Sequence, residues 1–467
     1  MSNEINFILN SNEISLDNDC SDILLDILRN DLKLKGTKEV CKEGDCGACT
    51  VLIGENHNGN ISYKNVNSCI YHKSLLKGKH VVTIEGLRFA GGLSFIQKMF
   101  YEEGATQCGY CTPGFIISTT GYFLNLLNRK PGAFNDEYNR LLEFVSGNIC
   151  RCTGHISIRR SLKNLLQKFH NEHKNDVITI DLLISENILP EYFSGIISSL
   201  PLSENYLSSG GTDLFVQNMN NTEGINPKHS KTDNYKKIFI SGNEIIIDAF
   251  ATVSDICESE ILLKYFPEIS KYRELFGSIQ IRNKATAGGN IVNASPIGDT
   301  VNILMALEAK LILSSVRGNR TILLKNFYTG YKTNVMDADE ILSEIRISIP
   351  QSQYIFSYEK ISKRMHLDIA SVNSTMYLQH DGDMIKNASI SAGGVAPYPL
   401  FLAKSCEYLA GKKISPEIFT ELEKVIESEI SPINDVRGSA LYKKLLTVRL
   451  VKMHFIKYYP ELASEII

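Results

Sequence analysis

The N-terminal stretch alternates apolar and polar positions in a way that predicts two strands followed by a helix. The sequence INFILNSNEISL at 5–16 forms two short runs about Ser11-Asn12, a pair that favours a hairpin turn. Residues 22–33 follow a helical period, with an apolar face made of Ile23, Leu24, Ile27 and Leu28. We therefore expect a small strand-and-helix domain that ends near residue 85.

The stretch 86–167 has the apolar periodicity of helices. One helix is predicted over FIISTTGYFLNLLNRKPG, because Thr112 can cap it, Pro113 suits its first turn and Gly132 follows its end. A second apolar period runs over 156–169. We expect a small helical bundle here.

The polar run KFHNEHKND at 168–176 predicts a linker, the longest boundary in the chain. Short strands and helices alternate after residue 177, and the polar stretch 217–237 predicts a flexible loop. A final mixed segment starts near residue 352. The expected domains are therefore 1–85, 86–167, 177–350 and 351–467, in an α+β multidomain chain.

Composition narrows the possible partners. The chain has 467 residues, 43% of them hydrophobic, and a net charge of −3. This length suits about three domains, and the weak negative charge indicates neither nucleic acid nor an anionic membrane as partner. No apolar run is long enough to span a bilayer, and the start MSNEINF lacks a signal region. We expect a cytoplasmic protein in which the cysteines stay reduced.

Eight of the eleven cysteines fall into two sets of four. The first set begins with the C-x4-C-x2-C spacing of plant-type [2Fe–2S] ferredoxins and consists of Cys41, Cys46, Cys49 and Cys69. The second set consists of Cys108, Cys111, Cys150 and Cys152. Four thiolates are what one [2Fe–2S] cluster requires, so the sequence predicts two clusters and transfer of electrons one at a time.

Structural zinc is the rival interpretation, since paired cysteines also bind zinc. Gly44 and Gly47 lie between the cysteines of the first set. Glycine permits positive φ and lets backbone N–H groups turn toward sulfur, which favours a cluster over a zinc hairpin. The scattered Cys20, Cys257 and Cys406 are predicted to be ordinary buried thiols.

Two glycine-rich loops could hold phosphate groups, because N–H groups freed by glycine form anion-binding nests. One is 208–213 and the other is 286–290. Each alone is more often a plain turn, and neither fits a dinucleotide-binding or P-loop motif. The context favours a role, because two one-electron clusters need a partner that exchanges electrons in pairs, and a flavin does so.

The motifs CKEGDCGACTV, QCGYCTPG (107–114) and GNICRCTG (147–154) resemble the iron–sulfur region of the molybdenum hydroxylases. The motifs SGGTDL (209–214), FGSIQIRNKATAGGNIVNASPIGD (276–299) and DIASV (368–372) are similar to the flavin domain of the same family. The likeness runs from residue 5 to RGSALYKKLL at 437–446. The order of the motifs resembles that in xanthine dehydrogenases.

The resemblance implies a β-grasp ferredoxin-like domain, a helical-bundle cluster domain, a two-part α+β FAD-binding domain and an α+β C-terminal domain. The first cysteine set would hold the cluster nearer the flavin, and the second set the cluster nearer molybdenum. Gln107 matches a glutamine that approaches the molybdopterin. The implied FAD positions are Leu207, Ser208, Ser209, Gly210, Gly211, Thr212, Asp213, Leu214, Phe276, Thr286, Ala287, Gly288, Gly289, Asn290, Asp299, Leu342 and Lys360.

The resemblance also implies a role. No molybdenum domain is expected in this chain, which looks like the small subunit of a split bacterial xanthine dehydrogenase. A molybdopterin-binding large subunit, in a heterotetramer of two small and two large chains, would oxidise hypoxanthine and xanthine to urate. Electrons would pass through the second and then the first cluster to FAD and NAD⁺, with no catalytic residue in this chain.

Three alternatives stay open, and they concern the substrate of the partner, the class of the protein and the binding of the electron acceptor. The partner could act on an aldehyde, nicotinate or another N-heterocycle. A zinc-stabilised or redox-sensing binding protein is the rival from a different class. His366-Leu367 stand where the mammalian enzyme has acidic residues, which leaves acceptor binding open.

Overall fold

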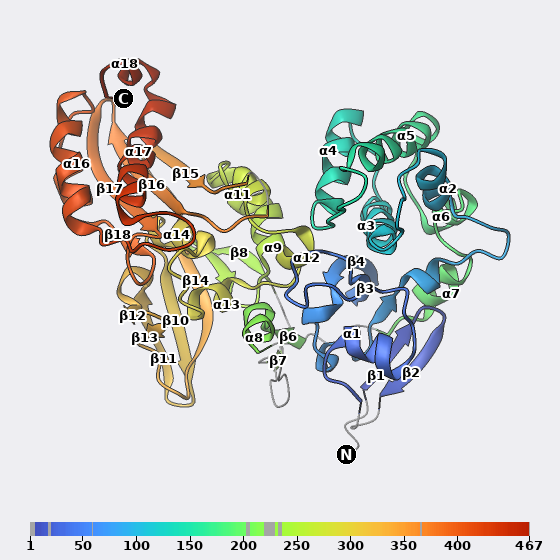
Figure 1. Ribbon diagram of the computed structural model, residues 1–467. Coiled ribbons are helices and arrows are strands. Elements are labelled where there is room, and N and C mark those ends of the chain that lie inside the picture. The colour runs from blue at the N-terminus through green and yellow to red at the C-terminus, as the bar shows by residue number, and fades with distance from the viewer. Residues whose placement is uncertain are drawn as a thin grey trace. The chain divides into compact units, whose positions relative to one another are not determined.

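The computed structural model describes residues 5–16, 20–57, 59–201, 206–218, 229–231, 236–364 and 367–466 (Figure 1). The chain forms two compact units. Unit 1 contains residues 1–233 together with the short segment 278–284, and unit 2 contains 234–277 and 285–467.

Unit 1 begins with a mixed sheet of strand order β2-β1-β5-β3-β4. Its strands are β1 (Ile5–Leu9), β2 (Asn12–Leu16), β3 (Thr50–His57), β4 (Asn60–Asn67) and β5 (His80–Val82). β1 pairs antiparallel with β2 and parallel with β5, which is the β-grasp arrangement. The predicted hairpin is confirmed, but its turn is Asn10-Ser11, one residue before the predicted pair, because Asn12 already pairs with Leu9 in the sheet and Asn10 takes the left-handed φ of 55°.

The predicted helix over 22–33 is present as a short α-helix, α1 (Leu24–Asp26), that continues as a π-helix over Ile27–Asp31. Leu24, Ile27 and Leu28 are fully buried against the sheet, as the apolar face predicts. The cysteine loop follows directly, so this helix and β3 fix the two ends of the loop that carries Cys41, Cys46 and Cys49.

Four helices form the expected bundle: α2 (Phe95–Glu102), α3 (Thr112–Asn125), α4 (Phe134–Val145) and α5 (Ile156–His173). They share one apolar core with the face of the N-terminal sheet, through residues such as Leu52 and Phe123. The predicted end of α3 near Gly132 is wrong. The buried carboxylate of Glu137 accepts hydrogen bonds from Arg129, Tyr122 and the Gly132 N–H, and these turn the chain back.

The capping of α3 also differs from the prediction. Cys111 occupies the N-cap position, Thr112 is the first helical residue and Pro113 lies in the first turn. The prediction that Thr112 caps the helix is therefore wrong by one residue, while Pro113 stands where expected.

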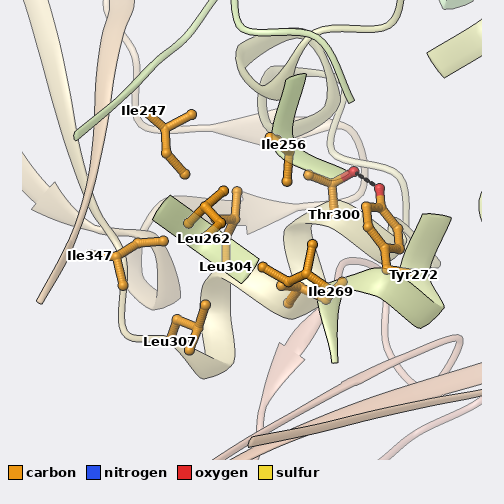
Figure 2. A pocket seen from close by; sticks show the side chains of 10 residues that line it. Ile247, Ile256, Leu262, Ile269, Tyr272, Thr300, Leu304, Leu307 and Ile347 are labelled. Carbon is orange, nitrogen blue, oxygen red and sulfur yellow. Dashed lines mark hydrogen bonds between the residues drawn. The ribbon is translucent and has the colours of Figure 1, made fainter. Parts of the chain in front are cut away.

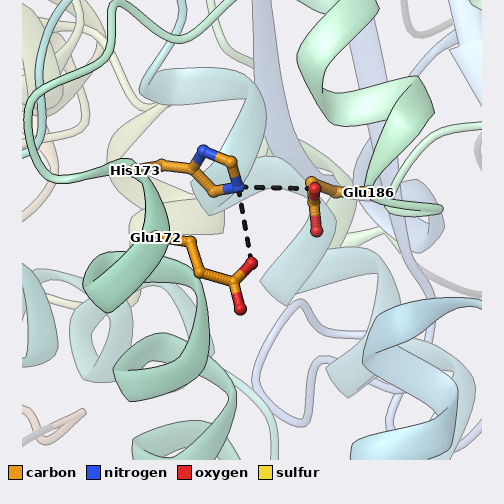
Figure 3. Close-up of side chains that lie close together, drawn as sticks. All are labelled: Glu172, His173 and Glu186. Atoms are coloured by element: carbon orange, nitrogen blue, oxygen red, sulfur yellow. Dashed lines mark ion pairs between the residues drawn. The ribbon is translucent and has the colours of Figure 1, made fainter.

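The linker predicted over 168–176 is wrong for most of its length, because α5 continues to His173. Phe169 is buried in the bundle core, which gives this polar run an apolar anchor. His173 lies in the last turn of α5. Its Nδ1 lies 3.0 Å from Asp176 and its Nε2 3.4 Å from Glu186, and Glu172 completes the group (Figure 3).

Unit 2 contains two large sheets and a two-stranded one, formed by β12 (Tyr328–Gly330) and β13 (Thr333–Asn334). The first, of order β11-β10-β14-β9-β8, is antiparallel throughout and consists of β8 (Ile238–Ser241), β9 (Glu244–Asp248), β10 (Lys310–Ser315), β11 (Gly318–Leu323) and β14 (Ile341–Ser348). Its helices include α9 (Val253–Glu258), α13 (Ala287–Val292) and α14 (Asp299–Ala306). Ile247, Leu262 and Leu304 line a small apolar cavity beside this sheet (Figure 2). Its polar pair, the Tyr272 and Thr300 hydroxyls, lies at 2.5 Å.

The second sheet has the order β15-β16-β17-β18, with β15 (Tyr354–Ile361), β16 (Val372–Asp381), β17 (Met384–Gly393) and β18 (Leu400–Phe401). Helices α15 (Ala403–Leu409), α16 (Glu417–Glu429) and α17 (Ala440–Tyr458) share one apolar core with it (Figure 1). The α+β prediction for both parts of unit 2 is confirmed. Much of the predicted polar loop 217–237 lies outside the described residues.

Across the described residues, every helix is too short or too polar to cross a membrane.

Buried His454 predicts an acid sensitivity of unit 2. Its ring lies between the hydroxyls of Ser357 and Ser374, at 2.8 and 3.1 Å. Burial, and then the charges of Lys457 and Lys271, lower its pKa from 6.5 to about 3. The unfolded chain therefore binds a proton that the folded chain excludes. The free energy of unfolding should fall by about 1.4 kcal/mol per pH unit as the pH drops from 6.5 toward 3.

Urea unfolding across this range measures the slope. His454→Gln should flatten it by about one proton, whereas His380→Gln, at an exposed position on β16, serves as the matched control. An unchanged slope in His454→Gln would show that His454 is not the group responsible.

Candidate functional site

The first cysteine set converges in one loop and one turn. Cys41 and Cys46 lie in the loop before β3, Cys49 directly precedes that strand, and Cys69 lies in a 3₁₀ turn, η2 (Ser68–Ile70), directly after β4. The Cys41 thiol is in hydrogen-bond contact with Cys46 and Cys69, and Cys49 is in contact with Cys69. The antiparallel pairing of β3 with β4 places Cys49 and Cys69 side by side. The four sulfurs are thus brought together.

Backbone N–H groups surround these sulfurs. Glu43 and Asp45 donate to the sulfur of Cys41, and Ala48 donates to that of Cys46. Gly44 and Gly47 have φ values of 78° and 67°, the left-handed conformation that turns the loop around the sulfurs. Such N–H···S bonds stabilise negative charge on sulfur.

The sulfurs of this set cannot all ionise unaided. Hydrogen bonds from Cys46 and Cys69 lower the pKa of Cys41, and the same contacts raise the pKa of Cys46 and Cys69. Each ionised sulfur therefore keeps a neighbour protonated, because like charges this close disfavour each other. Four thiolates together require a bound cation, which is the chemistry of a metal site.

The second set is held by the N-terminal ends of two helices. Cys108 and Cys111 precede α3, and Cys150 and Cys152 precede α5. The Sγ atoms of Cys152 and Cys108 lie 3.6 Å apart, and Cys111 is in contact with Cys150. Burial, and then the proton shared with Cys150, raise the pKa of Cys111 to about 12.

Cys150 differs from Cys111 in its surroundings. Burial raises its pKa, but hydrogen bonds from the Thr153 hydroxyl and N–H outweigh burial and leave it lowered. The Thr153 N–H lies 3.5 Å from the sulfur and the hydroxyl 3.2 Å. Its neighbour Cys111 occupies the N-cap of α3, where the positive end of the helix dipole favours negative charge.

The two sets differ in exposure. Cys49 and Cys69 are buried, while Cys108 and Cys152 are exposed, as are the neighbouring Gln107 and Arg151. The apolar side chains of Tyr110, Ile149 and Ile156 are 46%, 45% and 73% exposed. The first set is thus the more buried of the two, although Cys41 and Cys46 are half-buried and Cys150 of the second set is buried.

Each set offers the Cys₄ donors of a [2Fe–2S] cluster, and the N–H···S bonds fit that group. The remaining cysteines are partly as predicted. Cys257 and Cys406 are buried, but Cys20 is only half-buried, with the Lys73 amine 3.9 Å from its sulfur. The prediction that Cys20 is a buried thiol is therefore wrong.

The predicted phosphate loop 207–214 belongs to unit 1. Leu207 and Ser208 end the short strand β6 (Tyr206–Ser208), and α8 (Thr212–Gln217) follows. Gly211 has a φ of 66°, and a Cβ there would lie 2.7 Å from the Phe215 ring. The first N–H groups of α8 have no acceptor within the helix, so they can face an anion. Ser209, Gly210, Thr212, Asp213 and Leu214 complete the segment.

The loop 286–290 belongs to unit 2 and is more tightly engaged. The Ala287 and Gly288 N–H groups donate to the carbonyls of Ala251 and Ala249, and the Gly289 N–H donates to the Thr286 hydroxyl. A Cβ on Gly288 would lie 2.8 Å from Ala249. The expected nest of free N–H groups is therefore wrong for residues 287–289, whose glycine serves close packing against the end of β9.

The other predicted flavin positions lie in unit 2. Asp299 begins α14 and forms a buried ion pair with Lys360 of β15 at 2.8 Å. Lys360 also donates to the Leu275 carbonyl at 2.8 Å. Phe276 is half-buried against Tyr272, with ring centroids 5.2 Å apart, and Leu342 is buried in β14. His366 lies outside the described residues.

Sequence reasoning missed three polar residues that join the cysteine loops. Asn148 is buried and donates to the Gly47 carbonyl, and Ser118 donates to Asn148 at 2.7 Å. Gln280 reaches the same group from the segment 278–284, far along the sequence. Asn148 lies inside a cysteine motif, and this was the available signal of its role. Its partner Gln280 is distant in sequence, so the sequence did not reveal the contact.

Comparison with known families matches four segments in order. A 2Fe-2S iron-sulfur cluster binding domain matches residues 7–70, and a [2Fe-2S] binding domain matches 83–163. An FAD binding domain in molybdopterin dehydrogenase matches 207–352, and a CO dehydrogenase flavoprotein C-terminal domain matches 357–458.

Similar curated proteins include xanthine dehydrogenase 1 of Arabidopsis thaliana, 28% identical over 93% of this chain and 38% of the relative. Xanthine dehydrogenase/oxidase of Gallus gallus is 26% identical over 98% of this chain and 40% of the relative. Aldehyde oxidase 2 of Rattus norvegicus is 25% identical over 100% and 39%. The chain thus spans about two fifths of the length of these relatives.

Among solved structures, carbon monoxide dehydrogenase from Hydrogenophaga pseudoflava is 25% identical over 52% of this chain and 86% of that one, with a TM-score of 0.48. Carbon monoxide dehydrogenase from Oligotropha carboxidovorans is 26% identical over 46% and 75%, with a TM-score of 0.44. The four family matches thus give, in chain order, two [2Fe-2S] domains, an FAD binding domain and a flavoprotein C-terminal domain.

We expect Cys46→Ser and Cys111→Ser to remove different clusters, because the two residues belong to separate sulfur sets. Electron paramagnetic resonance of each reduced variant should show the loss of one of two rhombic signals. Cys257→Ser, at a buried cysteine outside both sets, is the control and should keep both. Loss of the same signal in both variants would contradict the assignment.

Proposed function

We propose that this protein is the iron–sulfur and flavin component of a xanthine dehydrogenase, a molybdenum hydroxylase. In this proposal electrons released at a molybdopterin-binding partner enter through the second cysteine set and leave through FAD to NAD⁺. The observation that carries the proposal is the presence of two four-sulfur sets, the second more exposed than the first, in a chain that also matches an FAD-binding domain.

The residues of this chain would position the clusters and stabilise negative charge on the sulfurs that hold them. When bound, an iron–sulfur cluster exchanges single electrons and a flavin exchanges one or two. Cys41, Cys46, Cys49 and Cys69 would hold one cluster, and Cys108, Cys111, Cys150 and Cys152 the other. The N–H groups of Glu43, Asp45 and Thr153 stabilise thiolate charge at the sulfurs. Burial of Cys49 and Cys69 in unit 1 limits the access of water to their sulfurs.

Each glycine loop, within its own unit, is a candidate FAD contact. The first turn of α8 offers backbone donors to a phosphate. The tightly packed 286–290 loop offers a rigid wall rather than free donors. The buried Asp299–Lys360 pair fixes the start of α14 near Leu275 and Phe276.

The exposed second set supports a partner contact. Gln107, Tyr110 and Arg151 lie next to its cysteines and are exposed. An interface that covers them would bury on the order of 2,000 Å² of surface or more, the size typical of obligate complexes. The partner we propose is a molybdopterin-binding large subunit, with two copies of each chain.

The substrate class rests on the relatives. Xanthine dehydrogenases of two organisms match over more than nine tenths of this chain, which favours hypoxanthine and xanthine. An aldehyde oxidase matches over a similar share, so an aldehyde-oxidising partner is the second candidate. Co-purification identifies the partner, and the residues of its substrate pocket then distinguish the purine-oxidising candidate from the aldehyde-oxidising one.

We expect about four irons, four acid-labile sulfides and one FAD per chain, since each four-cysteine set would hold one [2Fe–2S] cluster. Metal and sulfide analysis of protein purified without added metal measures this, with visible absorption as a second readout. Stoichiometric zinc with little iron would instead support the zinc-stabilised alternative.

We expect the isolated 467-residue chain to oxidise NADH with an artificial dye and to leave xanthine unchanged. The first reaction requires only FAD and an acceptor, while the second requires molybdenum. Steady-state assays of the highly purified chain, with and without co-purified partner, measure both. Xanthine turnover by this chain alone would overturn the proposal.

A further inference from the structure

The two cysteine loops are in direct backbone contact. The N–H of Ile149, the residue before Cys150, donates to the carbonyl of Cys46 at 3.0 Å. The side chain of Ile149 is 45% exposed, so its own burial does not explain why its N–H faces inward. One hydrogen bond therefore joins a cysteine of the first set to the residue preceding a cysteine of the second.

Asn148 makes a second link beside this one. Its Nδ2 donates to the Gly47 carbonyl at 2.9 Å, and its Oδ1 accepts from the Ser118 hydroxyl at 2.7 Å. Asn148 is only 3% exposed, and the Gln280 amide lies 3.4 Å from its Oδ1. Both ends of the amide are thus engaged, which fixes its orientation.

The two loops pack so closely that three glycines between them have no space for a side chain. A Cβ on Gly47 would lie 2.3 Å from the Gly147 carbonyl, and a Cβ on Gly147 would lie 2.1 Å from Gln280. A Cβ on Gly114, in the first turn of α3, would lie 2.6 Å from the Gly47 carbonyl. Glycine at these positions lets both loops and α3 meet at one point, and Asn148 is the side chain that fills it.

We propose that Asn148 is a positioning residue that sets the separation of the two clusters, with the Cys46–Ile149 hydrogen bond as their shortest bonded link. This inference rests on the proposed function, because it requires both sulfur sets to hold clusters. The exchange it serves moves one electron, so that one set's iron is oxidised as the other set's is reduced, and no bond or proton changes.

A hydrogen-bonded amide suits this task better than apolar packing. Apolar contacts are non-directional, whereas the Asn148 amide ties its own loop to the Gly47 carbonyl of the first cysteine loop and to the Ser118 hydroxyl of α3 at defined distances. Loss of the amide leaves the Ser118 hydroxyl buried without its acceptor, a penalty the loops can relieve only by moving. A shift of the loops changes the distance between the sets without removing any sulfur.

Asn148→Leu tests the inference, since leucine keeps the bulk and removes both hydrogen bonds. The magnetic interaction between two reduced clusters, seen as splitting or broadening at low temperature in electron paramagnetic resonance, depends on their separation. We expect Asn148→Leu to retain full iron and sulfide content and to show a weaker splitting. Asn65→Leu is the matched control, because Asn65 is a buried amide whose side chain donates to the Ser118 carbonyl at 3.3 Å.

Full iron content with an unchanged splitting in Asn148→Leu would overturn the inference and leave the proposed function intact. Absence of iron from the wild-type protein would instead overturn the proposed function. Hydrogen exchange of the wild-type holoprotein gives a second test that needs no variant. The Ile149 amide should exchange slowly despite its exposed side chain, and exchange as fast as that of the exposed Arg151 amide would also overturn the inference.

Discussion

The close approach of two cysteine loops is the constraint on which unit 1 depends. Four sulfurs must converge twice, and the two groups must also lie near each other. Gly47 and Gly147 meet where a Cβ would lie 2.3 Å from a neighbouring carbonyl, so no other residue fits without displacement. The β-grasp sheet and the helical bundle share one apolar core around this point, because each supplies one loop. The fold of unit 1 is thus organised around the contact between the loops rather than around either domain alone.

Buried polar groups carry much of the specificity in both units, since an unpaired buried group is costly and a paired one fixes geometry. In unit 1 the carboxylate of Glu137 gathers three donors and reverses the chain after α3. In unit 2 the Asp299–Lys360 pair ties α14 to β15, and His454 joins α17 to two strands of the second sheet. Each of these groups joins segments that are distant in sequence.

The flavin loops illustrate how one sequence feature can serve two purposes. The sequence predicts free N–H groups in both loops, because glycine permits the backbone conformations that form anion-binding nests. In 286–290 the N–H groups of Ala287, Gly288 and Gly289 already have acceptors, and Gly288 is required for its approach to Ala249. In 209–214 the left-handed Gly211 precedes a helix whose first N–H groups lack intrahelical acceptors. The same residue type therefore packs a backbone in one loop and frees donors in the other.

The sequence by itself determined the features that depend on local spacing. The cysteine intervals, the hairpin at 5–16 and the helical face of Leu24, Ile27 and Leu28 all follow from neighbours within a few residues, and the order of the four domains follows from motifs. The tertiary structure alone decided where α3 ends, that α5 continues through the polar run to His173, and that Asn148 and Gln280 join the cysteine loops. These outcomes depend on partners such as Glu137, Glu186 and Gly47. Such partners lie far along the chain, and periodicity carries no information about them.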